Sequence, residues 1–218
     1  HMPVAPLCKD VVDTWKRTDV RNTPTLVVNY GGVNSEYYWY NKMNIWENER
    51  FLKFYPQGSL DARSIRREVG PDWDYYHVEV AKQAKRLRDA GIKIQIGGHG
   101  QMQGWEIWSL VQGGFSPWQA LRAATIDGAD YLGYSSELGS IEAGKRADLV
   151  ITNTNPLDNI QNTIDTAYVM VNGRLFDAST MAEIGGKQRP APEFYFNQPQ
   201  TGLSVGQEFG PSMEAQGD

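Results

Sequence analysis

Histidines, which bind catalytic metals and move protons near neutral pH, are scarce in this sequence. The three of them are His1, His77 and His99, and the single cysteine is Cys8. One cysteine excludes an internal disulfide and a structural zinc site built from several thiolates. A metal site made from this chain alone would therefore be short of imidazole ligands.

His99 follows the segment with the clearest strand pattern. In residues 92–96, isoleucines alternate with Lys93 and Gln95, which is the period of a strand with one apolar face. If this strand lies in a barrel with helices outside, the isoleucines face the helices and the alternate positions from Lys93 to His99 face the lumen. His99 then stands at the carboxyl end of the strand, where barrel enzymes build their sites. There it could be a metal ligand or general base, or a structural donor to a loop carbonyl.

Three other features allow a chemical interpretation, but a simpler one is favoured for each. His77 lies near the start of a predicted helix, where a surface or half-buried structural role is commoner than metal binding. Glu106 could reach a pocket, but a solvated glutamate near a helix start is commoner. Ser204 lies in a G-x-S-x-G pattern, which needs a strand before it and a helix after it. Its surroundings favour a chance match, and a weak esterase is kept as an alternative.

The elements that would position these residues follow from local patterns. Apolar periodicity predicts helices over residues 9–21, 74–90, 105–111 and 115–133. The last begins with a capping box, Ser116 with Gln119, and with a proline at its first position. A β-branched run over residues 25–30, ended by Gly31-Gly32, predicts a buried strand.

The remaining segments show other patterns, namely an aromatic-rich stretch, a strand followed by a hairpin, and a tail. Residues 31–73 are crowded with aromatic side chains and are either a packed excursion with its own small core or a lid over a pocket. Residues 148–152 predict a strand, and Asn172-Gly173 predicts the turn of a hairpin. The patch Phe194–Phe196 should pack on something, and residues beyond about 197 should be extended or disordered.

Net charge and hydropathy exclude some partners. The net charge of -5 argues against nucleic acid and against an anionic membrane surface. No apolar run approaches the ~20 residues of a membrane span. We therefore expect neither a nucleic-acid nor a membrane partner. The 218 residues allow one large domain or two small ones.

Several longer stretches carry a family resemblance. LRAATIDGADYLG, LGSIEAGKRADLVITNTNPLDNI and YVMVNGRLFDA resemble the C-terminal part of metal-dependent amidohydrolases. TPTLVVNYGG and IGGHGQMQG are similar to the imidazolonepropionase/prolidase-like branch of that superfamily. The resemblance extends from Pro3 to about Phe196.

The resemblance implies an α/β fold, namely the C-terminal portion of a (β/α)8 barrel plus part of the flanking β-sandwich. It divides the chain into a partial barrel segment (1–138, with the aromatic-rich loop 31–73), a β-sandwich portion with the hairpin (139–184) and a tail (185–218). Family members use one or two divalent metals, usually zinc, to activate a water that attacks an amide, imide or ester carbonyl. The matching local contributors are His99 at the metal-water site, with Tyr30 and Gln101 lining the substrate pocket.

The sequence departs from the family pattern in four ways. A complete barrel takes ~250 residues, and residues 23–30 and 92–98 look like only its seventh and eighth strands. The His-x-His pair of the first strand has no counterpart, and Gly97-Gly98-His99 stand where most of the superfamily has Gly-Thr-Asp. The turn at Gly104-Trp105 also looks short, through a real deletion or a missing loop.

The expected function is therefore that of part of a metal-dependent amidohydrolase, which hydrolyses C–N bonds in a small amide or peptide-like substrate. Zinc or another divalent metal is expected in the intact protein. Whether these 218 residues alone bind a metal is left open. The alternatives are a noncatalytic assembly module and a weak esterase with an improvised site. Two barrel strands would expose sheet edges, so we expect self-association or pairing with the missing barrel segment.

Overall fold

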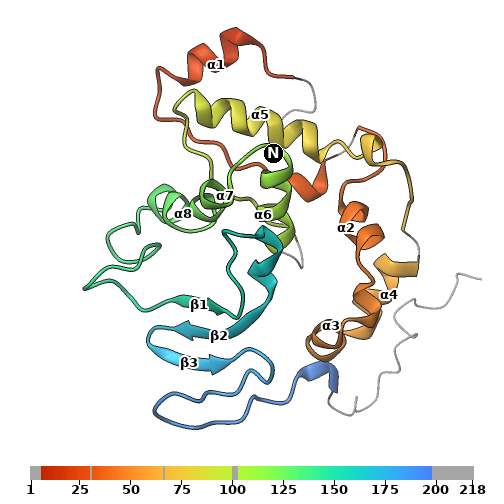
Figure 1. Ribbon diagram of the computed structural model, residues 1–218, viewed down its shortest axis with the longest axis vertical. Helices are drawn as coiled ribbons and strands as arrows, with labels where there is room; N and C mark the ends of the chain where they lie inside the picture. Colours follow the sequence, from red (N-terminus) through yellow and green to blue (C-terminus); the bar gives the residue numbers. More distant parts are fainter. Residues whose placement is uncertain (1–5, 30, 66, 100–102, 198–218) are drawn as a thin grey trace, which may run out of the picture.

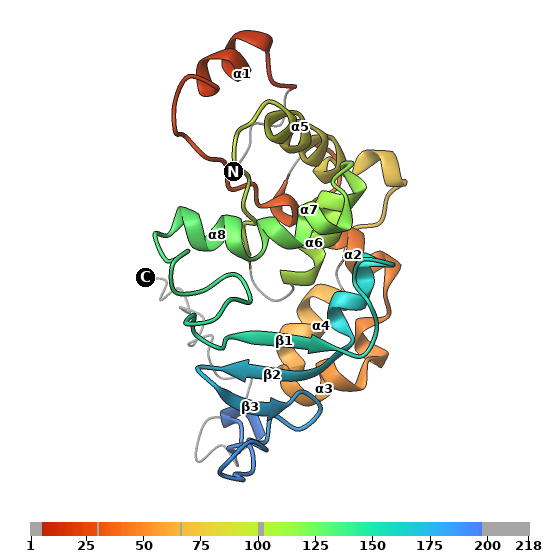
Figure 2. The same cartoon turned by 60° about the vertical axis from the view of Figure 1, so that its left-hand side comes forward.

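The structure is a computed structural model that describes residues 6–29, 31–65, 67–99 and 103–197. Helices α1, α5, α6, α7 and α8 gather at one end, and a small sheet lies at the other, with α2, α3 and α4 running along one side (Figures 1 and 2). In the described part of the chain, none of the helices is long and apolar enough to cross a membrane.

The helices and strands have the following bounds: α1 Lys9–Trp15, α2 Glu36–Lys42, α3 Glu49–Phe54, α4 Gln57–Ile65, α5 His77–Asp89, α6 Gln103–Gln112, α7 Pro117–Ala123, α8 Ile126–Tyr131, β1 Leu149–Thr152, β2 Thr166–Val171 and β3 Arg174–Asp177. Short 3-10 helices at Leu26–Val28, Ile45–Glu47, Asp72–Asp74, Ile160–Ile164 and Tyr195–Asn197 connect them.

The main core lies where α5, α6 and α7 meet the segment around Ile94. The predicted helices over 74–90 and 105–111 are confirmed as α5 and α6. The predicted helix over 9–21 is shorter, because α1 ends at Trp15, whose carbonyl accepts a hydrogen bond from the Thr18 hydroxyl. The buried apolar residues of this core are Leu7, Val12, Leu26, Val80, Ala81, Ala84, Leu87, Ile92, Ile94, Leu110, Phe115, Ala120 and Ala123.

The helix predicted over residues 115–133 is wrong as a single helix. Its capping box is confirmed, since the Ser116 hydroxyl and the Gln119 side chain each accept the other's backbone N–H. The helix is then broken at Thr125, whose φ of -130° and ψ of -101° are not helical. Leu132, which follows α8, is 65% exposed, whereas the apolar periodicity of a single helix over 115–133 would bury it.

The aromatic-rich residues 31–73 form α2, α3 and α4 around a second core, which supports the packed-excursion alternative. Tyr40 packs edge-to-face on Trp105, and Trp39 does the same on Trp108, with ring centroids 4.9 and 5.1 Å apart. The Trp39 indole N–H also donates to the Ser109 hydroxyl at 3.2 Å. Because their partners lie on α6, these aromatic side chains join the excursion to the main core.

The sheet has the order β1-β2-β3 and is antiparallel throughout. The predicted strand and hairpin are confirmed, and both turn residues, Asn172 (φ 48°) and Gly173 (φ 77°), have the positive φ of a type I′ turn. The predicted packing of the aromatic patch is also confirmed, because Phe194 meets Phe54 of α3 edge-to-face at 5.7 Å. The predicted tail beyond 197 lies outside the described residues.

The structure is thus mixed helix and strand. Neither a closed barrel nor a second sheet packed on β1-β2-β3 is present in the part of the chain that the structure describes. The three-part division of the chain at 138 and 184 stays a prediction.

Candidate functional site

The two predicted barrel strands are reduced to a short parallel pairing. The Asn22 N–H donates to the Lys93 carbonyl and the Gln95 N–H donates to the Asn22 carbonyl, both at 3.2 Å, and the Gly97 N–H donates to the Pro24 carbonyl at 2.8 Å. Between these last two bonds, a regular ladder would have a bond from residue 24 to the Gln95 carbonyl. That bond is missing because Pro24 has no N–H to donate. The two segments therefore lie side by side in the same direction, as adjacent barrel strands would.

Gly97 permits the closest approach of these segments. A Cβ at this position would lie 2.3 Å from the Thr25 hydroxyl oxygen and 2.5 Å from the Pro24 carbonyl oxygen, both far inside van der Waals contact. In the same parallel pair, the Gln95 side-chain amide donates to the Thr23 hydroxyl at 2.5 Å. The predicted orientation is confirmed for the isoleucines, since Ile92 and Ile94 are buried in the helical core.

The strand predicted over residues 25–30 is wrong, because Leu26–Val28 form a 3-10 helix. The cause is Glu106, whose carboxylate accepts the Leu26 N–H at 2.7 Å and the Val27 N–H at 3.2 Å. The Asn29 side-chain amide donates to the carbonyls of Thr25 and Leu26. These side chains satisfy backbone groups that a neighbouring strand would otherwise bind.

Glu106 is therefore a buried residue, contrary to the expectation of a solvated glutamate. It is 1% exposed. Burial raises the pKa of Glu106 to about 7, although the two backbone N–H donors oppose that shift. Sequence reasoning missed it, yet a signal existed: Glu106 is the one charged residue in the otherwise apolar run WEIWSLV. A helix that is apolar on all sides is buried, and so is the carboxylate on it.

His77 is also more deeply buried than expected, at 1% exposure. Its Nε2 lies 2.9 Å from the Gln112 side-chain oxygen, and the Gln112 amide donates to the Tyr38 hydroxyl at 3.0 Å. Burial lowers the pKa of His77 to about 4, and the Gln112 contact partly offsets this. The neutral imidazole is a structural link between α5, α6 and α2, as the sequence favoured.

The three predicted site residues are only partly placed. His99 is exposed, two residues beyond the last bonded residue of the parallel pair. Tyr30 and Gln101 lie outside the described residues, as does Ser204. The grouping of His99, Tyr30 and Gln101 around one pocket stays a prediction.

A metal centre does not fit the residues whose positions are known. Among the described residues, no three His, Cys, Asp or Glu side chains are grouped so that they could hold a metal ion. His99 is exposed, and the Nε2 of His77 is engaged by Gln112. The described residues therefore do not form a complete metal site by themselves.

Comparison with known proteins identifies a relationship over part of the chain. Residues 83–176 match the model of the amidohydrolase family. A 5'-deoxyadenosine deaminase of Methanobrevibacter smithii is 43% identical over 49 residues, which are 22% of this chain and 11% of that protein. An imidazolonepropionase of Geobacillus kaustophilus is 34% identical over 91 residues, which are 38% of this chain and 22% of that protein. The chain thus spans less than a quarter of either curated relative.

A solved structure extends the likeness to the fold. A Xaa-Pro dipeptidase with methionine bound in its active site superposes with a TM-score of 0.52 at 20% sequence identity, covering 78% of this chain and 38% of that one. At this identity the likeness concerns the fold alone. The match over residues 83–176 and the imidazolonepropionase relative confirm, for part of the chain, the resemblance to amidohydrolases noted in the sequence.

Proposed function

We propose that this chain is the C-terminal portion of a metal-dependent amidohydrolase that hydrolyses C–N bonds in small amide, imide or peptide-like molecules. The observation that carries the proposal is the family match over residues 83–176, a stretch that contains Gly97 and His99. The parallel pairing that ends at Gly97 supports two adjacent strands of a (β/α)8 barrel. The sheet β1-β2-β3 supports part of the flanking β-sandwich.

In this proposal most of the catalytic centre belongs to the complete protein. The described residues do not form a ligand set for zinc or another divalent metal, so those ligands would lie elsewhere in the protein or assembly. His99 would stand at the barrel mouth as a ligand or general base. Tyr30 and Gln101 would line the substrate pocket beside it.

Buried polar atoms support a further segment packed against the parallel pair. The side-chain oxygens of Asn22 and Gln95 are buried and have no hydrogen-bond partner among the described residues. A buried oxygen without a donor is costly, so a segment that supplies donors would stabilise this region. We therefore propose that the pair binds the rest of the barrel, or a second copy of the chain when the rest is absent.

The test uses the longest product of the gene that encodes this chain. We expect that product to bind zinc and to hydrolyse at least one of a panel of dipeptides, imides and lactams. His99→Ala should lower kcat/KM at least about a hundredfold, as loss of a general base does. Glu142→Gln, which changes an exposed carboxylate paired with Lys145 in its own loop, is the control and should leave kcat/KM unchanged. If His99→Ala hydrolyses the panel as the parent does, the assigned role of His99 is wrong.

A further inference from the structure

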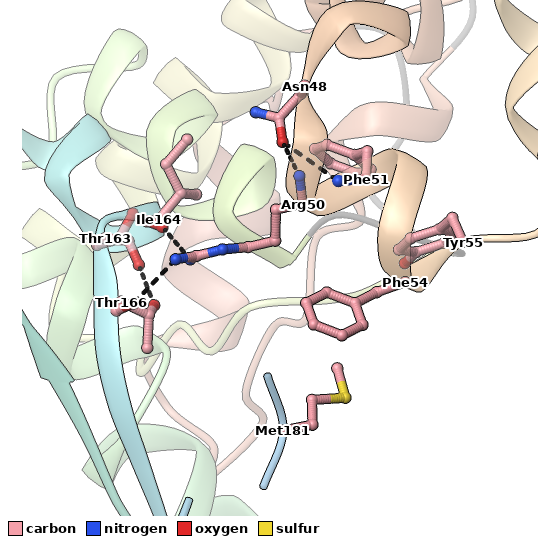
Figure 3. Close-up of a pocket in the computed structure, with 9 residues that line it drawn as sticks. All are labelled: Asn48, Arg50, Phe51, Phe54, Tyr55, Thr163, Ile164, Thr166 and Met181. Carbon is pink, nitrogen blue, oxygen red and sulfur yellow. Dashed lines mark hydrogen bonds between the residues drawn. The ribbon is translucent and has the colours of Figure 1, made fainter. Parts of the chain in front are cut away.

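A cavity of about 520 Å³ lies between α3 and the segment that leads into β2 (Figure 3), and no residue of the parallel pair lines it. Its walls are mainly apolar and come from two parts of the chain that are distant in sequence. The lining residues are Asn48, Arg50, Phe51, Phe54, Tyr55, Thr163, Ile164, Thr166 and Met181. The volume and the apolar lining with few polar groups are typical of small-molecule sites.

Arg50 is the charged group of this cavity, and it is held in place. Its two Nη atoms donate to the carbonyls of Ile164 and Thr166, both at 3.1 Å (Figure 3). A guanidinium has five N–H donors, so these two bonds leave others for a ligand. Among the described residues Arg50 has no carboxylate within ion-pair distance. The Asp165 carboxylate is hydrogen-bonded by Asn153 and Thr154, and the Arg50 charge acts on it from farther away, contributing to its lowered pKa.

A second cation, Lys53, lies over the ring of Phe54, which also lines the cavity. A hollow of about 560 Å³ adjoins the cavity through Asn48, Arg50 and Phe54, and it is also lined by Lys53 and Glu49. The Lys53 ammonium donates to the Ser179 carbonyl at 2.7 Å and lies 5.2 Å from the Phe54 ring centroid. Glu49 lines that hollow but not the cavity itself, where Arg50 is the charged lining residue.

Met181 shows backbone strain at the cavity wall. Its φ of 59° lies in the left-handed region, which a residue with a Cβ rarely adopts. Figure 3 shows its side chain opposite the Phe54 ring, across the opening. Such strain persists only where surrounding structure maintains it, and it is concentrated at ligand sites.

We propose that this cavity binds a small organic anion with an apolar body, of the aryl-alkyl carboxylate class. The ring would lie between Phe51, Phe54 and Met181, where an aromatic group finds edge and face contacts. The carboxylate would accept hydrogen bonds from the free N–H groups of Arg50, which the two backbone carbonyls already hold in position. This site is separate from His99 and does not depend on the hydrolytic function.

The experiment measures binding of 3-phenylpropionate to the purified chain by titration calorimetry and saturation-transfer NMR. Its neutral amide, 3-phenylpropanamide, is the matched ligand. We expect saturable binding of the acid. The amide should bind at least about tenfold more weakly, because it lacks the charge that strengthens the hydrogen bond to Arg50. Arg50→Gln should remove the preference for the acid.

Met181→Gly separates binding from folding. It removes a wall of the cavity and relieves the left-handed strain, so the Tm should hold or rise while affinity falls about fivefold or more. Asn172→Gly relieves a positive φ of 48° in the hairpin, away from the cavity, and should leave affinity unchanged. The proposal is overturned if the folded chain shows no saturable binding, or if Arg50→Gln and Met181→Gly bind both ligands as the parent chain does.

Discussion

Glu106 and His77 are two deeply buried titratable side chains whose ionisations act on stability in opposite directions. The pKa of Glu106 is raised from 4.5 to about 7, so its contribution is full below pH 4.5 and is lost as the pH rises towards 7. The pKa of His77 is lowered from 6.5 to about 4, so its contribution is full above pH 6.5 and is lost as the pH falls towards 4. Between pH 4.5 and 6.5 the two effects oppose each other in the parent chain.

Single substitutions should therefore expose each effect. In Glu106→Gln the His77 effect remains alone, and the free energy of unfolding should rise from pH 4.5 to 6.5 by roughly 2 kcal/mol more than in the parent chain. In His77→Phe only the Glu106 effect remains. The free energy of unfolding should then fall from pH 4.5 to 6.5 relative to its change in the parent chain. Urea denaturation at both pH values measures this. Parallel pH profiles in all three proteins would show that neither group titrates as its burial requires.

Sequence reasoning placed His77 correctly as structural, because a histidine at the start of an amphipathic helix has few other roles. It failed for Glu106, because the groups that bind this carboxylate, the N–H groups of Leu26 and Val27, lie 80 and 79 residues away in the chain. The apolar run WEIWSLV indicates that the carboxylate is buried, but no local pattern identifies these two partners. The candidate site residue His99 was predicted from strand parity. That prediction holds only if residues 92–99 form a strand of a barrel with helices outside.

At the scale of elements, the parallel pair depends on the absence of a side chain at position 97. Gly97→Ala would force its Cβ against Thr25 and Pro24, so we expect a loss of about 1–3 kcal/mol in the free energy of unfolding. Gly58 in α4 has nothing within 4 Å of an added Cβ, and Gly58→Ala should gain up to about 1 kcal/mol. Thermal and urea unfolding measure both. If the two variants are equally stable, the close approach at Gly97 is wrong.

A charge cluster at Asp127 lies just after the break between α7 and α8. Its carboxylate accepts hydrogen bonds from Arg88 of α5 at 3.0 Å and from Arg122 of α7 at 2.9 Å, and it is 7% exposed. Asp127→Asn should lower the free energy of unfolding by roughly 1.5–3 kcal/mol, the range for hydrogen bonds to charged groups. The control, Glu79→Gln, breaks an exposed pair with Lys82 and should cost under about 1 kcal/mol. Equal losses would contradict a stabilising role for the cluster.

Elements that arise from local chemistry were predictable from the sequence. The Ser116 capping box, the Asn172-Gly173 turn and the amphipathic face of α5 all depend on residues within a few positions of one another. The 3-10 helix at Leu26–Val28 was not predictable in this way, since a β-branched run favours a strand but does not ensure one. Without neighbouring strands its backbone is bound by Glu106 and Asn29 instead.

At the scale of the whole molecule, the sheet end is poorly covered. Val150, Ile151 and Val171 are 64%, 41% and 53% exposed, so β1 exposes apolar side chains on both faces, although a β-sheet of this kind normally buries at least one face. Exposed apolar strands associate with other chains. We therefore expect the purified chain to form dimers or larger species, which multi-angle light scattering would detect. A monodisperse monomer at micromolar concentration would contradict this.

The central claim is that this chain holds one part of an amidohydrolase whose metal centre is completed by the rest of the protein. The most direct test measures zinc per chain and hydrolysis of a dipeptide and imide panel for the 218-residue chain and for the longest product of the same gene. We predict about one or two zinc ions and hydrolysis in the longer product, and neither in the chain alone. Stoichiometric zinc together with hydrolysis by the 218-residue chain alone would contradict the claim.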